Sequence, residues 1–415
     1  MDRKRSSFLP ILLVLAVLSG LGARDVAAQP GPAGPETRVD SPVDSPESAT
    51  GLDCPLLAVA PDQSTEIVWS DFGDGGDPPS LLGRHYAPDG TATDPEPVQL
   101  ASAGDPDHAL HAELLSPLPK GFRLIFGRFD TVSSSPSMVF SQRLNLSGRP
   151  APGPPLSVGA ADTQWILPGP GGVLYASRTL AGQKSIVIQQ ISSTGAPAGP
   201  RIVVNDRPIY LPDLQMVPLG AEDFVAVWSG LAVPSGHPFP RQVIRARRFH
   251  RGAPAGKEFD VASLYSGLRF VVAADPASGG FAVAWPVPGN LGDSIHLRFF
   301  GASGRPDGRE QVAVPSGGYP IVRDAAFDDS GDLLLLWQVP TNGGGLRARA
   351  FGSTGGRVTT LGPAFPVNSE ASGAFDSQGC GHAAWAAGSW RITWEAGRSD
   401  GGSDAIFVRA FTKGS

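Results

Sequence analysis

The sequence predicts an all-β fold: a seven-bladed β-propeller of four-stranded blades. A segment of apolar residues that ends in an aromatic residue recurs seven times along the chain, with a spacing in the range of propeller and solenoid repeats. The seven aromatic residues are Trp69, Phe126, Tyr175, Trp228, Trp285, Trp337 and Trp394. Helical periodicity is absent after Ala28, where short β-type segments alternate with Gly-containing turns instead. One repeat domain therefore accounts for nearly all of the 415 residues.

The fifth repeat shows the expected order of strands within a blade. We expect its four strands at 270–273, 281–285, 295–300 and 311–314. Gly, Pro, Asp and Ser residues form turns between the first and second strands and between the third and fourth. A longer loop, 286–293, separates the second strand from the third. Four short strands are the content of one propeller blade.

The last repeat stops after its third strand, at 406–411. A missing fourth strand would leave the hydrogen-bonding groups of a strand edge unpaired. Near the N-terminus, the Pro-Val-Asp-Ser of residues 42–45 matches the Pro-Val-Asn-Ser of residues 366–369, which occupy the fourth-strand position of the sixth repeat. We therefore expect an N-terminal strand to close the ring.

The two cysteines, Cys54 and Cys380, occupy similar positions in the first and last repeats, because each precedes the aromatic residue of its repeat, Trp69 or Trp394, by nearly the same interval. These repeats are neighbours in a closed ring, so we expect a disulfide between them. Two buried free thiols are the alternative.

The repeated aromatic residues are interpreted as core residues that fill the space between blades, not as ligand-stacking residues. Arginines of the third strands, such as Arg247, Arg298 and Arg409, alternate with apolar residues. We interpret these arginines as residues that pack and form salt bridges between neighbouring blades, not as an anion site.

Residues 1–28 have the pattern of a signal peptide, with a basic start, an apolar run at 8–18 and the small residues Val26-Ala27-Ala28. The apolar run is shorter than the roughly 20 residues that span a bilayer, so we expect cleavage rather than an anchor. Residues 29–38, rich in Pro and Gly, are expected to be a disordered leader, and residues 39–415 the propeller. The product would be exported, periplasmic or extracellular, and free of the membrane after cleavage.

The charge of the chain limits its partners. A formal net charge of −6 gives no basic field for phosphate backbones, so nucleic acid is not an expected partner. We expect a monomer that binds a protein or a glycan.

The repeat motif also carries a resemblance. Trp228 is followed by Ala-Arg-Arg-Phe at 246–249 and Gly-Ala-Pro-Ala-Gly at 252–256, and Trp337 by Arg-Ala-Arg-Ala-Phe at 347–351. From about residue 40 to its end, the chain resembles a group of exported bacterial β-propeller repeat proteins with these Trp, Arg-x-Phe and Gly-x-Pro-x-Gly elements. The resemblance implies the fold and no shared reaction.

The loops that follow the aromatic residues differ from repeat to repeat, whereas the turns expected on the opposite face are nearly uniform. Variable loops on a rigid scaffold are the usual place for binding residues. The candidate binding residues on this variable-loop face are Asp71, Asp74, Asp77, His237, Asn342, Glu395 and Asp404.

Asp71, Asp74 and Asp77 share one Gly-rich loop, so their carboxylates are candidate ligands for Ca²⁺. Asp and Gly are also ordinary turn formers, which makes a solvated turn the alternative. No other cofactor is expected.

Three functions fit these features. The first is an exported, non-enzymatic propeller that binds a protein or glycan on the variable-loop face. The second is a hydrolase or lyase of extracellular polysaccharide, with carboxylates such as Asp71, Asp74, Glu395 or Asp404 at the channel mouth. The third is a structural component of the cell envelope. The sequence has no His-Glu-x-x-His pair, Gly-x-Ser-x-Gly elbow or phosphate loop, so it names no reaction.

Overall fold

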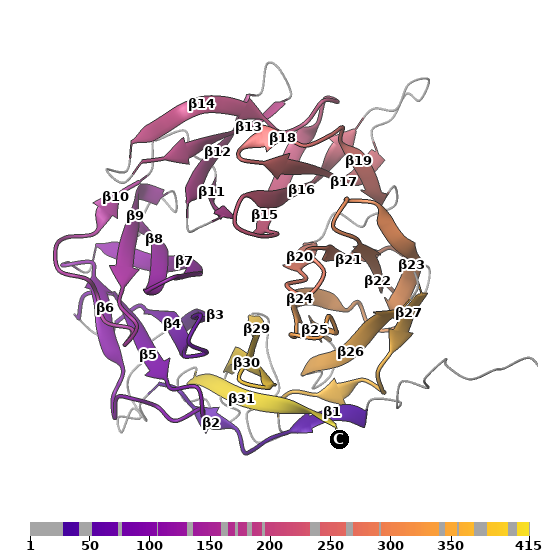
Figure 1. Ribbon diagram of the computed structural model, residues 1–415. Coiled ribbons are helices and arrows are strands. Elements are labelled where there is room, and N and C mark those ends of the chain that lie inside the picture. Colours follow the sequence, from indigo (N-terminus) through magenta and orange to yellow (C-terminus); the bar gives the residue numbers. More distant parts are fainter. Residues whose placement is uncertain are drawn as a thin grey trace, which may run out of the picture.

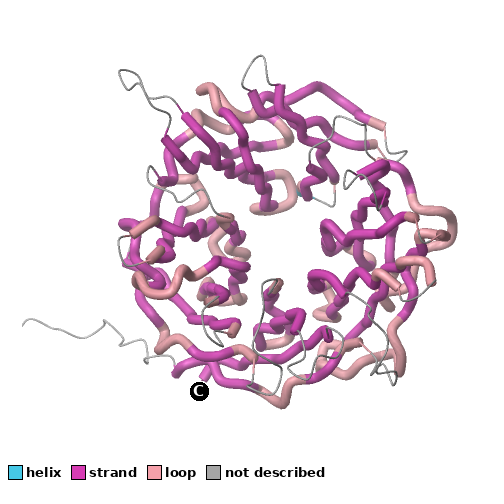
Figure 2. The backbone as a smooth tube through the Cα atoms, turned by 180° about the vertical axis from the view of Figure 1, so that it is seen from behind, coloured by secondary structure: helices cyan, strands magenta, loops and turns pink. Residues whose placement is uncertain are grey.

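The computed structural model is a ring of seven antiparallel sheets around a central axis (Figure 1). It describes residues 28–40, 52–73, 77–105, 107–130, 136–158, 165–170, 173–180, 185–192, 196–232, 241–262, 269–289, 292–339, 345–354, 357–368, 380–396 and 405–414. The described residues form strands, loops and turns but no α-helix (Figure 2). The predicted seven-bladed β-propeller is confirmed.

Each blade begins with the strand nearest the axis and ends with the outermost one (Figure 1). Blade 1 contains β3 (Leu52–Val59), β4 (Thr65–Asp71), β5 (Ser80–Tyr86) and β6 (Val98–Ser102). Blade 2 contains β7 (His108–Leu118), β8 (Gly121–Asp130), β9 (Pro136–Leu144) and β10 (Leu156–Ser157). Blade 3 contains β11 (Trp165–Pro168), β12 (Leu174–Leu180), β13 (Ser185–Ile191) and β14 (Pro197–Val203).

The remaining four blades repeat this order. Blade 4 contains β15 (Tyr210–Pro218), β16 (Asp223–Ala232), β17 (Arg241–His250), β18 (Ala253–Pro254) and β19 (Phe259–Ala262). Blade 5 contains β20 (Val271–Ala274), β21 (Phe281–Val287), β22 (Ser294–Phe300) and β23 (Pro306–Val314). Blade 6 contains β24 (Ile321–Phe327), β25 (Leu333–Gln338), β26 (Leu346–Thr354), β27 (Arg357–Thr360) and β28 (Phe365–Pro366). Blade 7 contains β29 (Gly381–Ala386), β30 (Ser389–Ala396), β31 (Ala405–Gly414), β1 (Ala28–Pro32) and β2 (Thr37–Arg38).

The second strand of a blade is apolar throughout because both of its faces are covered. In β25 every residue is buried. Successive side chains of a strand point to opposite faces. Leu333 and Leu335 accordingly pack in one cluster with blade 5, whereas Leu334 and Leu336 pack in another with blade 7. The core is thus a set of layers between neighbouring blades.

The repeated aromatic residues belong to these layers. Trp69, Trp228 and Trp285 are fully buried, and Phe126 and Tyr175 are buried in the second and third repeats. The indole N–H groups of those three tryptophans are buried and have no hydrogen-bond partner among the described residues. Their side chains therefore fill space between blades, as the sequence predicts, and do not present a polar group to a ligand.

The N-terminal segment closes the ring, but not with the residues that the sequence analysis selected. β1 and β2 both pair with β31, with Thr37 opposite Val408 and Arg38 opposite Phe407. Residues 29–38, which we expected to be a disordered leader, are therefore part of the blade 7 sheet. Residues 42–45, which we expected to supply the strand, lie outside the described residues, as do residues 1–27 of the predicted signal peptide.

The sequence contains Val-Asp-Ser twice, at 39–41 and 43–45, and the structure uses the first copy. Val39 is fully buried; its N–H donates to the Ile406 carbonyl oxygen over 2.7 Å, and Asp40 Oδ1 accepts from the Ile406 N–H over 2.7 Å. The equivalent pairs Val204-Asn205 and Val367-Asn368 make the same two bonds in blades 3 and 6. The fourth strands of blades 4 and 6 are also split into two pieces. Because β1 and β2 both pair with β31, Val39 takes the buried position that Val204 and Val367 take in blades 3 and 6.

Arginines of the third strands connect neighbouring blades, as predicted. Each donates a hydrogen bond from Nη1 to the carbonyl oxygen of a valine at the end of the preceding blade. The pairs are Arg84–Val39, Arg247–Val204, Arg298–Val261 and Arg409–Val367, at 2.6, 3.3, 3.2 and 3.4 Å. The Val39 carbonyl thus accepts from a third-strand arginine, as the corresponding valines of three other blades do. This contact supports the first Val-Asp-Ser copy as the segment that closes the ring.

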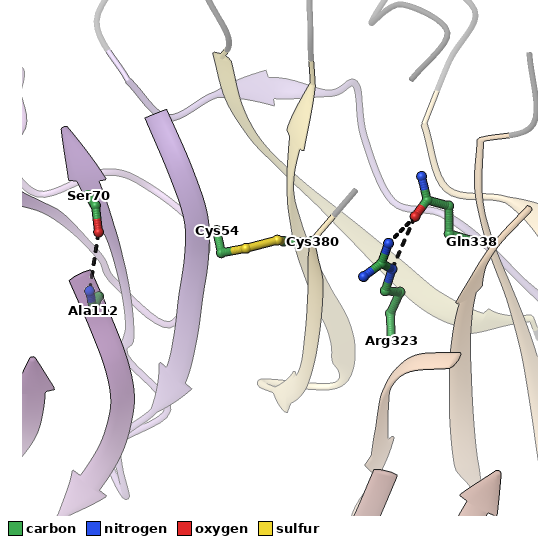
Figure 3. Close-up of a disulfide and its surroundings, with 6 residues drawn as sticks. All are labelled: Cys54, Ser70, Ala112, Arg323, Gln338 and Cys380. Carbon is green, nitrogen blue, oxygen red and sulfur yellow. Dashed lines mark hydrogen bonds between the residues drawn. A yellow bond between two sulfur atoms is a disulfide. The ribbon is translucent and has the colours of Figure 1, made fainter. Parts of the chain in front are cut away.

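The predicted disulfide between Cys54 and Cys380 is confirmed. Cys54 lies on β3 and Cys380 directly precedes β29, so the bond joins the innermost strands of blades 1 and 7 (Figure 3). The Cα atoms are 5.1 Å apart, within the range of disulfides. The seam between the first and last blades is therefore held by a covalent bond near the axis and by β1 and β2 at the outer edge.

Candidate functional site

The variable-loop face carries the loops between second and third strands and those between one blade and the next. Of the seven predicted binding residues, Asp71, Asp77 and Glu395 belong to the described part of the chain. The other four, Asp74, His237, Asn342 and Asp404, lie outside the described residues. The predicted site therefore remains a prediction as a whole, although parts of its surroundings are defined.

Asp71 ends β4 and begins a tight turn. Its Oδ1 accepts a hydrogen bond of 3.0 Å from the backbone N–H of Gly73. Gly73 has φ 71° and lies so close to the carbonyl of Asp77 that a Cβ atom there would be 2.3 Å from that oxygen. The loop thus folds back on itself, with Asp71 and Asp77 at its two ends. Because Asp74 is outside the described residues, Ca²⁺ binding by this loop stays a prediction.

Glu395 lies on β30 beside the disulfide rather than in an acidic group. Its carboxylate and the two sulfurs of Cys54 and Cys380 lie within 4.8 Å of one another. Both sulfurs are bonded to each other and are not available to a metal ion. Within the part of the chain that the structure describes, no other three His, Cys, Asp or Glu residues bring ligand atoms that close together. Glu395 is 8% exposed, so it belongs to the seam between blades.

The structure brings together aromatic residues that the sequence analysis did not single out. His111 of β7 lies between Phe72, which follows Asp71, and Phe129 of β8. The ring centroids are 5.1 Å from His111 to Phe72 and 4.8 Å from His111 to Phe129. All three side chains are partly exposed. We call Phe72, His111, Phe129 and the neighbouring Glu113 the His111 cluster.

A β-bulge and a glycine make room for this cluster. The register of β7 against β8 shifts between Ala112 and Leu114, which leaves Glu113 as the extra residue. A Cβ atom on Gly127 would lie 2.6 Å from Glu113 Oε1 and 2.5 Å from the Phe129 ring, so a larger residue there would displace the side chains of the cluster. The six other repeats have a larger residue directly after the aromatic position. That exception at Gly127 is the sequence signal that points to this place.

Glu113 differs electrostatically from an ordinary surface carboxylate. Its side chain is exposed, yet surrounding protein atoms partly desolvate the carboxylate and raise its pKa, while nearby His111 acts in the opposite direction. A raised pKa favours the protonated form, which donates as well as accepts hydrogen bonds. The His111 cluster therefore combines ring surfaces with a titratable group.

An ion group lies next to this cluster on the same face. Asp105, in the connection between β6 and β7, is 2.6 Å from His108 Nδ1 through Oδ1 and accepts from Arg128 Nη2 over 2.9 Å through Oδ2. The hydrogen bond to His108 is the main reason that the pKa of Asp105 is lowered; desolvation opposes it, and the charges of His108 and Arg128 add to it. These contacts fix the start of β7, where His111 follows.

Polar residues on the other side of the ring form pairs rather than one site. Arg323, at a register shift in the innermost strand β24, donates from Nε to Gln338 Oε1 over 3.1 Å (Figure 3). Burial, together with the charge of Arg269, lowers the pKa of Arg323 to about 10. Asp324 Oδ2 accepts from the Ala383 N–H over 2.9 Å and lies 3.3 Å from His382 Nδ1.

The carboxylates with raised pKa are dispersed among the described residues. Burial raises the pKa of Glu66, Glu113 and Asp213, which belong to blades 1, 2 and 4. A glycosidase of the usual type needs two carboxylates on either side of one bond, a few ångströms apart. The three carboxylates of raised pKa therefore do not form one group among the described residues.

Comparisons with known proteins do not assign a family to the chain. No protein-family model matches it, and no curated protein matches it either. No helix among the described residues has the length and apolar character needed to cross a membrane.

Solved structures share the fold at low sequence identity. A polysaccharide lyase described as an ulvan lyase matches with a TM-score of 0.50 and 9% identity over 92% of this chain and 94% of its own. A protein of unknown function from Dyadobacter fermentans matches with a TM-score of 0.46 and 12% identity over 91% and 99%. A subtype N11 neuraminidase-like protein of the flat-faced bat strain H18N11 matches with 0.44 and 12% over 72% and 87%. At these identities the likeness concerns the fold alone.

Proposed function

We propose that this chain is an exported binding protein that recognises a glycan on its variable-loop face, with the His111 cluster as part of the site. The observation that carries the proposal is the arrangement of Phe72, His111 and Phe129 at the boundary of blades 1 and 2. Partly exposed aromatic rings with a few polar groups beside them are typical of ligand sites. The disulfide between Cys54 and Cys380 supports export, because such bonds persist in oxidising compartments.

The composition of the cluster favours a glycan over a protein as the ligand. Sugar rings offer apolar faces that pack on aromatic side chains and hydroxyl groups that need donors and acceptors. Phe72 and Phe129 supply ring surface, and Glu113 supplies carboxyl oxygens. A protein ligand is the second possibility, because propellers commonly serve as scaffolds for protein binding.

A polysaccharide hydrolase or lyase is the alternative that Glu113 favours most, since its pKa is raised beside a histidine. The candidate partner carboxylate with a raised pKa, Asp213, belongs to blade 4 on another part of the ring. Among the described residues, no other carboxylate of raised pKa lies in blade 2 beside Glu113, so we favour binding over glycosidic bond cleavage.

A glycan array with the purified mature protein, with and without Ca²⁺, tests the proposal. We expect binding to one glycan class and a loss of about tenfold in affinity for Phe72→Ala and for His111→Ala. His250→Ala is the matched control. His250 is exposed at the end of β17 in blade 4, on the face opposite the variable loops. Loss of binding without Ca²⁺ would add the 71–77 loop to the site. A silent array with folded protein, or equal binding by all three variants, would contradict the proposal.

A further inference from the structure

A cavity of about 310 Å³ lies between blades 1 and 2, which are neighbours in the ring (Figure 1). One wall is the end of β6, the outermost strand of blade 1, at residues 100–102. The opposite wall comes from β7, β8 and β9 of blade 2 and from the connection at 150–155. The volume is at the lower end of the range of small-molecule sites. Phe126 of β8 lines this cavity, whereas Phe129 of the His111 cluster points to the other face of β8, so the two places are separate.

The first reason for this cavity is the residue in the repeated aromatic position. Phe126 takes the place that a tryptophan takes in five of the other six repeats. Those tryptophans pack in core clusters with residues of the preceding blade, and Phe126 packs in the same way with blade 1. A phenyl ring is smaller than an indole, so it fills less of the space between two blades.

The second reason is a shorter side chain on the third strand. Gln142 stands two residues after Phe140, the partner of Phe126 across the sheet. Blades 1, 4, 5 and 7 have an arginine at the equivalent position, and that arginine reaches a carbonyl oxygen of the preceding blade. Gln142 instead donates from Nε2 within blade 2, to the carbonyl oxygens of Arg143 and Ala151 over 3.3 and 3.4 Å. It therefore lines the cavity rather than crossing to blade 1.

The walls are mainly apolar. Leu100 and Leu110 are buried, and the connection at 150–155 adds two prolines. Phe126 and Phe140 stack on each other, with their ring centroids 5.3 Å apart and 24° between the ring planes. Apolar cavities of this kind take up small aromatic molecules.

The polar groups at the wall favour a neutral ligand. Among the described residues that line the cavity, the charged one is Arg128, which donates from Nη2 to Asp105 over 2.9 Å. Ser102 Oγ accepts from the Gly104 N–H over 3.2 Å. Gln142 is bonded through Nε2, and its Oε1 can accept from a ligand. The wall thus offers apolar surface and one amide oxygen, not an unpaired charge.

We propose that this cavity binds a small, neutral, planar aromatic molecule of about the size of indole, with one N–H or O–H donor. Its ring would pack on Phe126, Leu100 and Leu110, in the space that the repeats with a tryptophan fill with their own indole. Its donor would bond to Gln142 Oε1. This binding is independent of the glycan recognition proposed for the His111 cluster.

Calorimetric titration with indole, and with inositol as a polar ring, tests the proposal. We expect indole to bind with a Kd below about 1 mM. Inositol should bind at least about tenfold more weakly, because its hydroxyl groups would lose water in an apolar cavity. Phe126→Trp places the indole of the other repeats in the cavity and should weaken indole binding by about tenfold or more. Tyr319→Trp is the matched control, since Tyr319 is 61% exposed between blades 5 and 6, and it should leave binding unchanged.

The melting temperature of Phe126→Trp is a second measurement of the same cavity. If the space accepts an indole, this variant should melt no lower than the wild type, because the larger ring fills a cavity. A lower melting temperature would mean that an indole does not fit, and it would overturn the proposal. The absence of binding at about 5 mM indole would overturn it too, as would inositol binding as tightly as indole. Unchanged indole binding in Phe126→Trp, or equal losses in Phe126→Trp and Tyr319→Trp, would place any indole elsewhere and contradict the assigned site.

Discussion

Arg84 donates a hydrogen bond of 2.6 Å from Nη1 to the carbonyl oxygen of Val39, and so joins blade 1 to the segment that completes blade 7. Three other blades use the same contact, from a third-strand arginine to a valine of the preceding blade. The closing seam of the ring is therefore built like three other blade boundaries, although its two sides come from opposite ends of the chain.

The first prediction concerns Val39. Its side chain is fully buried in a cluster with Ile67 and Trp69. Val39→Asp would place an unpaired charge in that cluster, and we expect the free energy of unfolding to fall by about 3 kcal/mol or more. Urea denaturation of both variants measures this. Val43→Asp, in the second Val-Asp-Ser copy, is the matched change, and a larger loss there would assign ring closure to that copy instead.

The second prediction concerns the disulfide of Cys54 and Cys380, which encloses a loop of 326 residues in sequence separation. The chain-entropy model gives a stabilisation of about 6 kcal/mol for so long a loop, as an upper value. Replacing both cysteines with alanine should lower the melting temperature, and a reductant should lower that of the wild type to a similar value. The reductant should leave the double variant unchanged. A wild type that melts at the same temperature in both conditions would contradict the assigned role.

The third prediction separates the size of a core tryptophan from its polar group. Trp285 is fully buried, and its indole N–H has no partner among the described residues. Trp285→Ala should cost about 3–5 kcal/mol of stability because it leaves a cavity between blades 4 and 5. Trp285→Phe keeps much of the ring and loses no hydrogen bond, so it should cost under about 2 kcal/mol. Equal losses in calorimetric melting would show that the N–H group matters after all.

Local sequence patterns predicted the blades well because the residue types within each strand indicate which of its faces are buried. The unbroken apolar run at 333–337 is a strand covered on both faces, and the residues just before it form a turn. The choice between Val39 and Val43 had no such local signal. Both copies of the motif fit the repeat, and only pairing with β31, at the far end of the chain, decides between them.

The His111 cluster was missed for a related reason. Phe72 and His111 come from different blades, and they meet only when blades 1 and 2 pack against each other. A histidine in an innermost strand does not by itself indicate aromatic neighbours. Of the residues that the sequence analysis selected, Asp71 borders this cluster because it directly precedes Phe72.

The last prediction concerns the pH dependence of stability and rests on Glu66. Glu66 of β4 is 1% exposed, and its Oε2 lies 3.0 Å from Nδ1 of the buried His85. Burial raises the pKa of Glu66 from 4.5 to about 7, although His85 opposes the shift. Between these two pH values the folded chain holds the proton more tightly than the unfolded chain does. The contribution of Glu66 to stability is therefore complete below about pH 4.5 and is lost as the pH rises through about 7.

Glu66→Gln should remove this dependence while nearly keeping the shape of the side chain. The stability of the variant relative to the wild type should increase from pH 5 to pH 8 by up to about 3 kcal/mol, as the pKa difference implies. Urea denaturation at both pH values measures the difference, in which the contributions of other titrating groups cancel. Glu310→Gln removes a carboxylate paired with His296 at an exposed site, and it should show little change with pH. A variant that loses stability relative to the wild type at pH 8 would mean that Glu66 acts as an ionised partner of His85, because only a carboxylate could then supply the missing attraction.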